Sequence, residues 1–154
     1  MSHTDAAQAV VHAPPHVVFA ALVDETARTV WLPPTGLTGH FTWFDARSGG
    51  GYRMTLTYDD ESTRGKSDGN TDIVEVRFVS LDEPHQLVEE ADFVSDDPSL
   101  SGTMTMTWSL GPVEDGTLVA ITASNVPDGI SSEDHATAFA STLQNLDEYV
   151  TGRA

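Results

Sequence analysis

Residues 131–150 read SSEDHATAFASTLQNLDEYV, and this stretch decides what the rest of the chain must form. Its apolar side chains recur at steps of three and four residues, which places them on one face of an α-helix. Ser131, followed by Asp134 three residues later, is typical of a helix N-terminus, because both side chains can bond free backbone N–H groups. The stretch therefore predicts one long amphipathic helix, whose apolar face carries His135, Phe139, Leu143, Leu146 and Val150.

Upstream of this helix, apolar and polar residues alternate as they do in strands with one buried face. A first strand is expected at 7–13, and two short helices follow, the first at the paired prolines 14–15 and the second at about 24–31. A polar connection is expected at 59–70. Six more strands are predicted from the alternating residues Phe41 and Trp43, Tyr52 to Tyr58, Val74 to Phe78, Leu87 to Phe93, Met104 to Leu110, and Val119 to Ala123.

An antiparallel sheet with one apolar face needs a second layer to cover it. A helix of about 20 residues spans roughly 30 Å and can supply that layer. Alanines at 136, 138 and 140 keep the predicted helix slim. Seven strands wrapped around it enclose more volume than its side chains fill, so we expect a cavity between sheet and helix.

The charge balance excludes several kinds of partner. The chain of 154 residues has 7 basic and 24 acidic residues, a formal net charge of −17, and no cysteine. Such a surface repels phosphate groups, so neither nucleic acid nor a membrane is an expected partner. The absence of cysteine and of an apolar N-terminal segment favours a cytoplasmic protein. A high-salt environment would explain the acidity, because counterions screen the repulsion between carboxylates.

Several short stretches, spread over nearly the whole chain, are similar to those of one known superfamily. They are Val11-His-Ala-Pro14, Val18-Phe-Ala-Ala-Leu22, Trp31-Leu-Pro-Pro34, Asp45-Ala-Arg-Ser-Gly-Gly50 with Tyr52-Arg53, Glu75 before Pro84, and His135 with Phe139 and Leu143. In these residues the chain resembles the START-like (SRPBCC) superfamily, and within it most closely the branch of the activator of heat-shock protein 90 ATPase, which is also described as polyketide cyclase-like. The last helix has Ala138-Phe139 where this branch usually has Gly-Trp.

The resemblance implies an α+β helix-grip fold like that of birch pollen allergen, in one domain at 1–154. In this fold a curved antiparallel sheet of six to seven strands surrounds a long C-terminal helix, and two short helices follow the first strand. It also implies a hydrophobic ligand cavity between the sheet and the last helix, without a cofactor. Some members carry out aromatase or cyclase chemistry, so fold alone does not fix the function.

The predicted cavity would be lined by the inward residues of the strands and of the last helix. The six histidines are scattered along the chain, and no metal site is expected. The candidate ligand-binding residues are Trp31, Trp43, Tyr52, Met54, Glu89, Phe93, Met104, Met106, Trp108, Phe139 and Leu143.

Glu89 is the most informative polar residue, because alternation places it with Leu87, Ala91 and Phe93 on the face toward the helix. A carboxylate there is either a structural group or a ligand anchor and acid–base catalyst, and the candidate catalytic residues are Glu89, Tyr52 and His135. Without a cationic partner, replacing Glu89 by Gln should stabilise the fold. If an arginine holds the carboxylate, the same change should destabilise it.

Three functions follow from these observations. The first is binding of a small apolar or aromatic molecule. The second is a cyclase, aromatase or dehydratase that uses a cavity carboxylate. The third is a co-chaperone-like module that binds another protein, and a homodimer is a further partner hypothesis.

Overall fold

The computed structural model describes residues 2–60, 62–63, 65 and 69–152, so the predicted connection at 59–70 lies partly outside the described residues. None of the helices in this part of the chain has the length and hydrophobicity that a membrane span requires. The elements in order are β1 (His3–Val11), α1 (Pro15–Leu22), α2 (Glu25–Trp31), β2 (Leu37–Asp45), β3 (Gly51–Tyr58), β4 (Thr71–Asp82), β5 (Gln86–Phe93), the short 3-10 helix η1 (Pro98–Leu100), β6 (Met104–Val113), β7 (Gly116–Val126) and α3 (Ser132–Val150).

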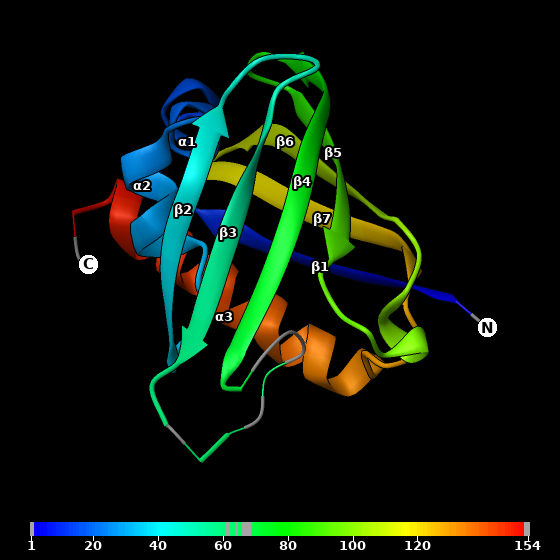
Figure 1. Ribbon diagram of the computed structural model, residues 1–154. Coiled ribbons are helices and arrows are strands. Elements are labelled where there is room, and N and C mark those ends of the chain that lie inside the picture. The colour runs from blue at the N-terminus through cyan, green and yellow to red at the C-terminus, as the bar shows by residue number, and fades with distance from the viewer. Residues whose placement is uncertain (1, 61, 64, 66–68, 153–154) are drawn as a thin grey trace.

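The strands form one curved antiparallel sheet in the order β1-β7-β6-β5-β4-β3-β2 (Figure 1). β1 and β2 are the two edges. β1 pairs with β7, and in every other neighbouring pair the two strands are consecutive in the chain. α3 lies across the concave face, and α1 and α2 pack together near its C-terminal end (Figure 1). This arrangement confirms the predicted α+β helix-grip fold.

α3 begins where the sequence indicates. The Ser131 hydroxyl accepts a hydrogen bond of 3.0 Å from the Asp134 backbone N–H, which satisfies one of the free donors of the first turn. His135, Phe139, Leu143 and Leu146 are buried, as predicted for the apolar face. These four side chains therefore form one continuous buried stripe on the face of α3 that packs toward the sheet.

Two strands differ from the prediction. β1 begins four residues earlier than expected and ends at Val11, before the paired prolines. In β2 the register shifts between Phe41 and Trp43, because Thr42 is an extra residue without its own partner on β3. Phe41 is buried and Trp43 is 46% exposed, so the predicted sharing of one face by these two rings is wrong.

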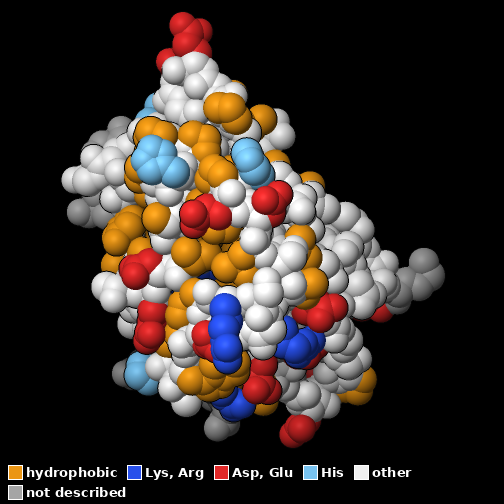
Figure 2. All heavy atoms as spheres, turned by 90° about the horizontal axis from the view of Figure 1, so that it is seen from above, with side chains coloured by type: hydrophobic (Ala, Val, Ile, Leu, Met, Phe, Trp, Pro, Cys, Tyr) orange, Lys and Arg blue, Asp and Glu red, His pale blue; other side chains and the backbone are white. Residues whose placement is uncertain are grey.

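Acidic side chains are distributed widely over the surface. Figure 2 shows one face on which Asp and Glu side chains are scattered among hydrophobic ones, whereas the Lys and Arg side chains gather in one small area. Arg53 pairs with Glu75 on the neighbouring strand, and Arg77 with Asp92. These two cations are therefore partly neutralised by neighbours on the sheet.

Candidate functional site

A cavity of about 490 Å³ lies between the concave face of the sheet and α3. Strands β3 to β6 supply one wall, α3 supplies the other, and the segment between α2 and β2 closes one side. We call the part at Tyr52 and Glu89 the inner end, because both residues are almost fully buried. The mouth is the part at Thr35, Asp134 and Thr137, which are exposed.

Most of the lining predicted from the strand patterns and from α3 is present. The side chains are mainly apolar and include three methionines, which adapt their shape readily to different contacts. Of the predicted ligand-binding residues, those that line the cavity are Tyr52, Met54, Glu89, Phe93, Met104, Met106 and Phe139, and the candidate catalytic residue His135 joins them.

Four predicted lining residues lie elsewhere. Trp31 and Trp108 are buried in the core beside the cavity, where their rings meet edge to face with centroids 5.5 Å apart. The Trp31 indole N–H donates to the Ala21 carbonyl, which fixes this ring against α1. Leu143 is also buried outside the lining, and Trp43 points to solvent because of the bulge in β2.

At the inner end, Glu89 has two partners that the sequence analysis did not identify. The Trp108 indole N–H donates to Glu89 Oε1 at 2.9 Å. Arg28 Nη1 lies 3.5 Å from Glu89 Oε2, and both side chains are almost completely buried. Glu89 is thus inside, as predicted, but it is compensated by a cation.

Arg28 comes from α2 and is held by hydrogen bonds through Nε and Nη1 and by aromatic rings, whereas its Nη2 is buried without a hydrogen bond among the described residues. Its Nε donates to the Leu22 carbonyl, and its Nη1 donates to the Tyr52 hydroxyl at 3.0 Å. Its guanidinium carbon lies 5.2–6.0 Å from the ring centroids of four aromatic residues, a distance at which a cation is attracted to aromatic rings. These residues are Trp31, Tyr52, Phe78 and Trp108.

A sequence signal for Arg28 did exist. In a helix at 24–31, Arg28 shares a face with Trp31 three residues later, next to the small Ala27. A cation on an apolar helical face, in a chain with an apolar sheet and one inward carboxylate, indicates a buried ion pair.

Burial raises the pKa of Tyr52 above its usual value, and the nearby negative charge of Glu89 adds to this effect. The guanidinium of Arg28 opposes the shift without cancelling it. Tyr52 therefore keeps its proton at neutral pH and can act as a hydrogen-bond donor.

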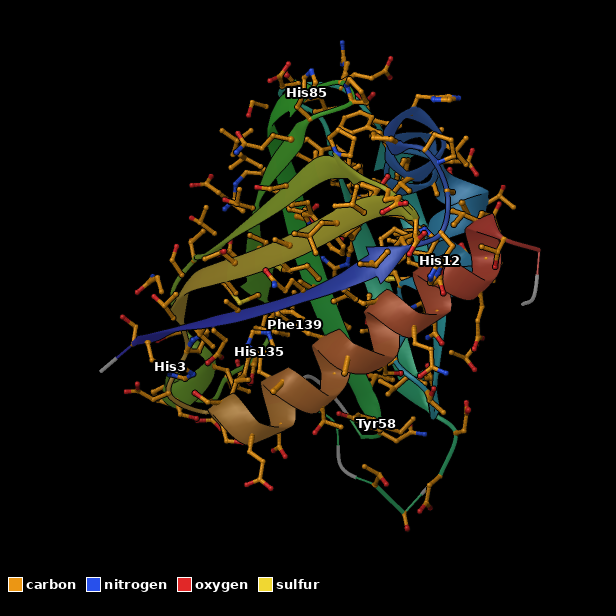
Figure 3. All side chains as sticks on the ribbon, turned by 180° about the vertical axis from the view of Figure 1, so that it is seen from behind. His3, His12, Tyr58, His85, His135 and Phe139 are labelled. Carbon is orange, nitrogen blue, oxygen red and sulfur yellow. The ribbon has the colours of Figure 1, made fainter. Side chains whose placement is uncertain are left out.

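A second polar cluster lies at the N-terminal end of α3. His135 Nδ1 is 2.7 Å from Asp5 Oδ2, and His3 Nε2 is 3.0 Å from the same oxygen. Figure 3 shows His3 and His135 at this end of α3, with Phe139 one turn further along, between helix and sheet. The His135 and Phe139 rings are 4.0 Å apart between centroids.

The Asp5 carboxylate is stabilised by its neighbours. Burial raises its pKa, but hydrogen bonds with Ser132 and His135 and the charges of His135 and His3 outweigh this and lower the pKa below the usual value. The arrangement fixes one ring nitrogen of His135 and leaves the imidazole beside the cavity, where it can hold or transfer a proton.

Between β3 and β4, the hydroxyl of the lining residue Tyr58 donates to Asp72 Oδ2 at 3.0 Å. Within the described ranges, no group of three His, Cys, Asp or Glu side chains is placed to hold a metal ion. The side chains described at this site offer hydrogen bonding, proton transfer and apolar contact.

Residues 12–151 match the model of the family described as Activator of Hsp90 ATPase homolog 1-like protein. The chain belongs to this family. The Activator of Hsp90 ATPase homolog 1-like family has the START-like fold, which commonly binds hydrophobic ligands. The resemblance seen in the sequence is thus confirmed, and no curated protein matches the chain.

Solved structures share the fold of this Activator of Hsp90 ATPase homolog 1-like chain. A protein from Chromobacterium violaceum is 28% identical, with a TM-score of 0.85 and coverage of 96% of each chain. A protein from Rhodobacter sphaeroides is 22% identical, with a TM-score of 0.78 and coverage of 100% of this chain and 95% of that one. A solution structure from Arthrobacter aurescens is 17% identical, with a TM-score of 0.77 and coverage of 99% and 88%.

Proposed function

We propose that the cavity between the sheet and α3 binds a small apolar or aromatic molecule. The observation that carries this proposal is its volume of about 490 Å³ behind a mainly apolar wall. Ligand sites in proteins have volumes of roughly 300–1,000 Å³ and combine an apolar lining with a few polar groups. A filled core of the same residues would pack without such a space.

Short side chains keep the space open. Ala91 on β5 and Ala138 on α3 both line the cavity, so neither wall projects far into it. Met54, Met104 and Met106 supply flexible thioether side chains around it, which suits a ligand whose shape is not matched by a rigid wall.

The test is to fill the cavity from the helix side. A tryptophan at Ala138 projects into the space, whereas a tryptophan at the exposed Ala136, two residues earlier on the same helix, does not line it. We expect Ala138→Trp to weaken binding of the neutral dye N-phenyl-1-naphthylamine at least tenfold, an energy of about 1.4 kcal/mol. Ala136→Trp should bind like the wild type.

Dye fluorescence titration and native mass spectrometry of freshly purified protein measure this directly. Retention of an apolar mass by the wild type and its loss from Ala138→Trp would identify the cavity as the site. If the wild type binds neither dye nor any small molecule, or if both tryptophan variants bind equally, the proposal is wrong. The cyclase-like and co-chaperone-like hypotheses stay predictions, since no contact described above favours either over binding.

A further inference from the structure

Two polar atoms at the inner end of the cavity indicate which group the ligand carries there. We propose that the ligand is an uncharged alcohol or phenol whose hydroxyl lies between Tyr52 and Glu89, an inference that rests on the proposed ligand-binding function. The rest of the molecule would occupy the apolar part of the cavity, toward Phe139 and the methionines.

Tyr52 offers a donor. Its oxygen already accepts from Arg28 Nη1 at 3.0 Å, and within the described residues its own proton has no acceptor. A hydrogen bond received by the phenol oxygen polarises the O–H group and strengthens it as a donor. Because Tyr52 lines the cavity, the natural acceptor for this proton is an oxygen of the ligand.

Glu89 offers an acceptor. Its Oε1 is bonded by Trp108, whereas its Oε2 is buried and makes no hydrogen bond in the described part of the chain. Leaving a buried acceptor unbonded costs free energy that a ligand donor can recover. This oxygen and the Tyr52 oxygen lie within 3.5 Å of the same nitrogen of Arg28, so the two are neighbours at the inner end, and a group placed between them would meet a donor and an acceptor together. A hydroxyl accepts and donates at once.

The charges around the cavity select against ionised ligands. Asp72, Glu89 and Asp134 line it, and no lysine or arginine is found among its described lining residues. A carboxylate would meet like charges at both ends. An ammonium group would gain little, because Arg28 already compensates Glu89 and would repel a second cation.

Three probes with one biphenyl body separate these cases: 4-phenylphenol, 4-methoxybiphenyl and biphenyl-4-carboxylate. We expect calorimetric titration of the wild type to give affinities about tenfold higher for the phenol than for the ether, with the carboxylate weakest. Tyr52→Phe should weaken binding of both the phenol and the ether, because the oxygen of each accepts the Tyr52 proton, and the preference for the phenol should remain, because it comes from donation to Glu89. Tyr149→Phe, which removes a hydroxyl outside the lining, should leave both affinities unchanged.

Crystals of the phenol complex provide a second measurement, with the ligand oxygen expected within hydrogen-bond distance of both Tyr52 Oη and Glu89 Oε2. If phenol and ether bind the wild type equally, or if Tyr52→Phe binds the phenol as tightly as the wild type does, the hydroxyl inference is overturned while cavity binding stands. If no probe binds, both proposals fail. The wild-type comparison decides even if Tyr52→Phe does not fold.

Discussion

Arg28 and Glu89 form a buried ion pair at the inner end of the cavity. Both side chains are almost fully buried, and their closest charged atoms are 3.5 Å apart. Removing one member of such a pair leaves the other as an uncompensated buried charge. The condition set out from the sequence, an inward carboxylate without a cation, is therefore not met.

We predict that Glu89→Gln destabilises the protein by about 3–5 kcal/mol, the usual cost of breaking a buried ion pair. The amide retains an acceptor for the Trp108 indole but leaves the charge of Arg28 unpaired. Urea unfolding at neutral pH measures the change in the free energy of unfolding.

The matched control is Glu75→Gln. Its partner Arg53 lies at 3.4 Å, but both side chains are partly exposed, and surface pairs contribute only about 0–1 kcal/mol. A Glu89→Gln protein as stable as the wild type, or more stable, would show that the ion pair does not hold the inner end together.

At the scale of whole elements, α3 is fixed to the edge strand β1 at both ends. Asp5 contacts His135 at the N-terminal end, and the His12 backbone and ring both bond Asp147 near the C-terminal end. Figure 3 shows His3 at the start of β1 and His12 directly after its end, along the helix. Since α3 forms one wall of the cavity, these contacts hold the wall in place.

Asp5 should make the free energy of unfolding depend on pH in the acidic range. Its folded-state pKa is lowered from the usual 3.8, so its contribution is complete above that value and disappears as pH falls through the folded pKa. We predict that Asp5→Asn lowers the free energy of unfolding by about 1–3 kcal/mol at neutral pH, because His135 and His3 lose a charged acceptor. The difference in unfolding free energy between Asp5→Asn and the wild type should shrink as the pH falls below 3.8.

Urea unfolding of both proteins between neutral pH and about pH 3 tests this. Asp115→Asn, in the exposed turn between β6 and β7, is the control and should follow the wild type throughout. A difference between Asp5→Asn and wild type that is constant over the whole range would contradict the assignment of the acid-sensitive contact to Asp5.

The elements that could be predicted from the sequence are those in which buried residues recur at a regular spacing. α3 and the inward faces of β5 and β6 were predicted correctly, including the inward direction of Glu89, because alternation places every second residue on one side. The prediction for Trp43 was wrong because one extra residue in β2 changes the phase of the alternation. A bulge cannot be recognised from alternation alone.

The partners within the site were harder to predict than its walls. Arg28 meets Glu89 across 61 residues of sequence, and only the packing of α2 against the sheet brings them together. Trp31 and Trp108 are inward-facing as predicted, yet they fill the core beside the cavity instead of lining it. Periodicity indicates which face of a strand or helix a residue lies on, but it indicates neither how deep in the core the side chain lies nor which residues it contacts.

The whole molecule carries far more negative than positive charge. A net charge of −17 on 154 residues must favour expansion of the chain through self-repulsion. The described arginines on the sheet are already paired with acidic neighbours, so they offer little further compensation. Dissolved ions are the remaining source of screening.

We therefore predict that the melting temperature rises as potassium chloride increases from about 0.01 M to about 1 M, over which the screening length falls from roughly 30 Å to roughly 3 Å. Asp82→Lys, Glu83→Lys and Glu114→Lys replace exposed acidic residues at two hairpins, the first at the end of β4 and the other two in turns. Each change alters the net charge by two, so the triple variant has −11 instead of −17. Its melting temperature should rise less steeply with salt, whereas salt effects on apolar burial act on both proteins alike. If the melting temperature rises equally steeply with salt in both proteins, the rise is due to apolar burial. If the melting temperature of the wild type stays constant or falls, repulsion between carboxylates does not determine its stability, and the high-salt explanation of the composition is wrong.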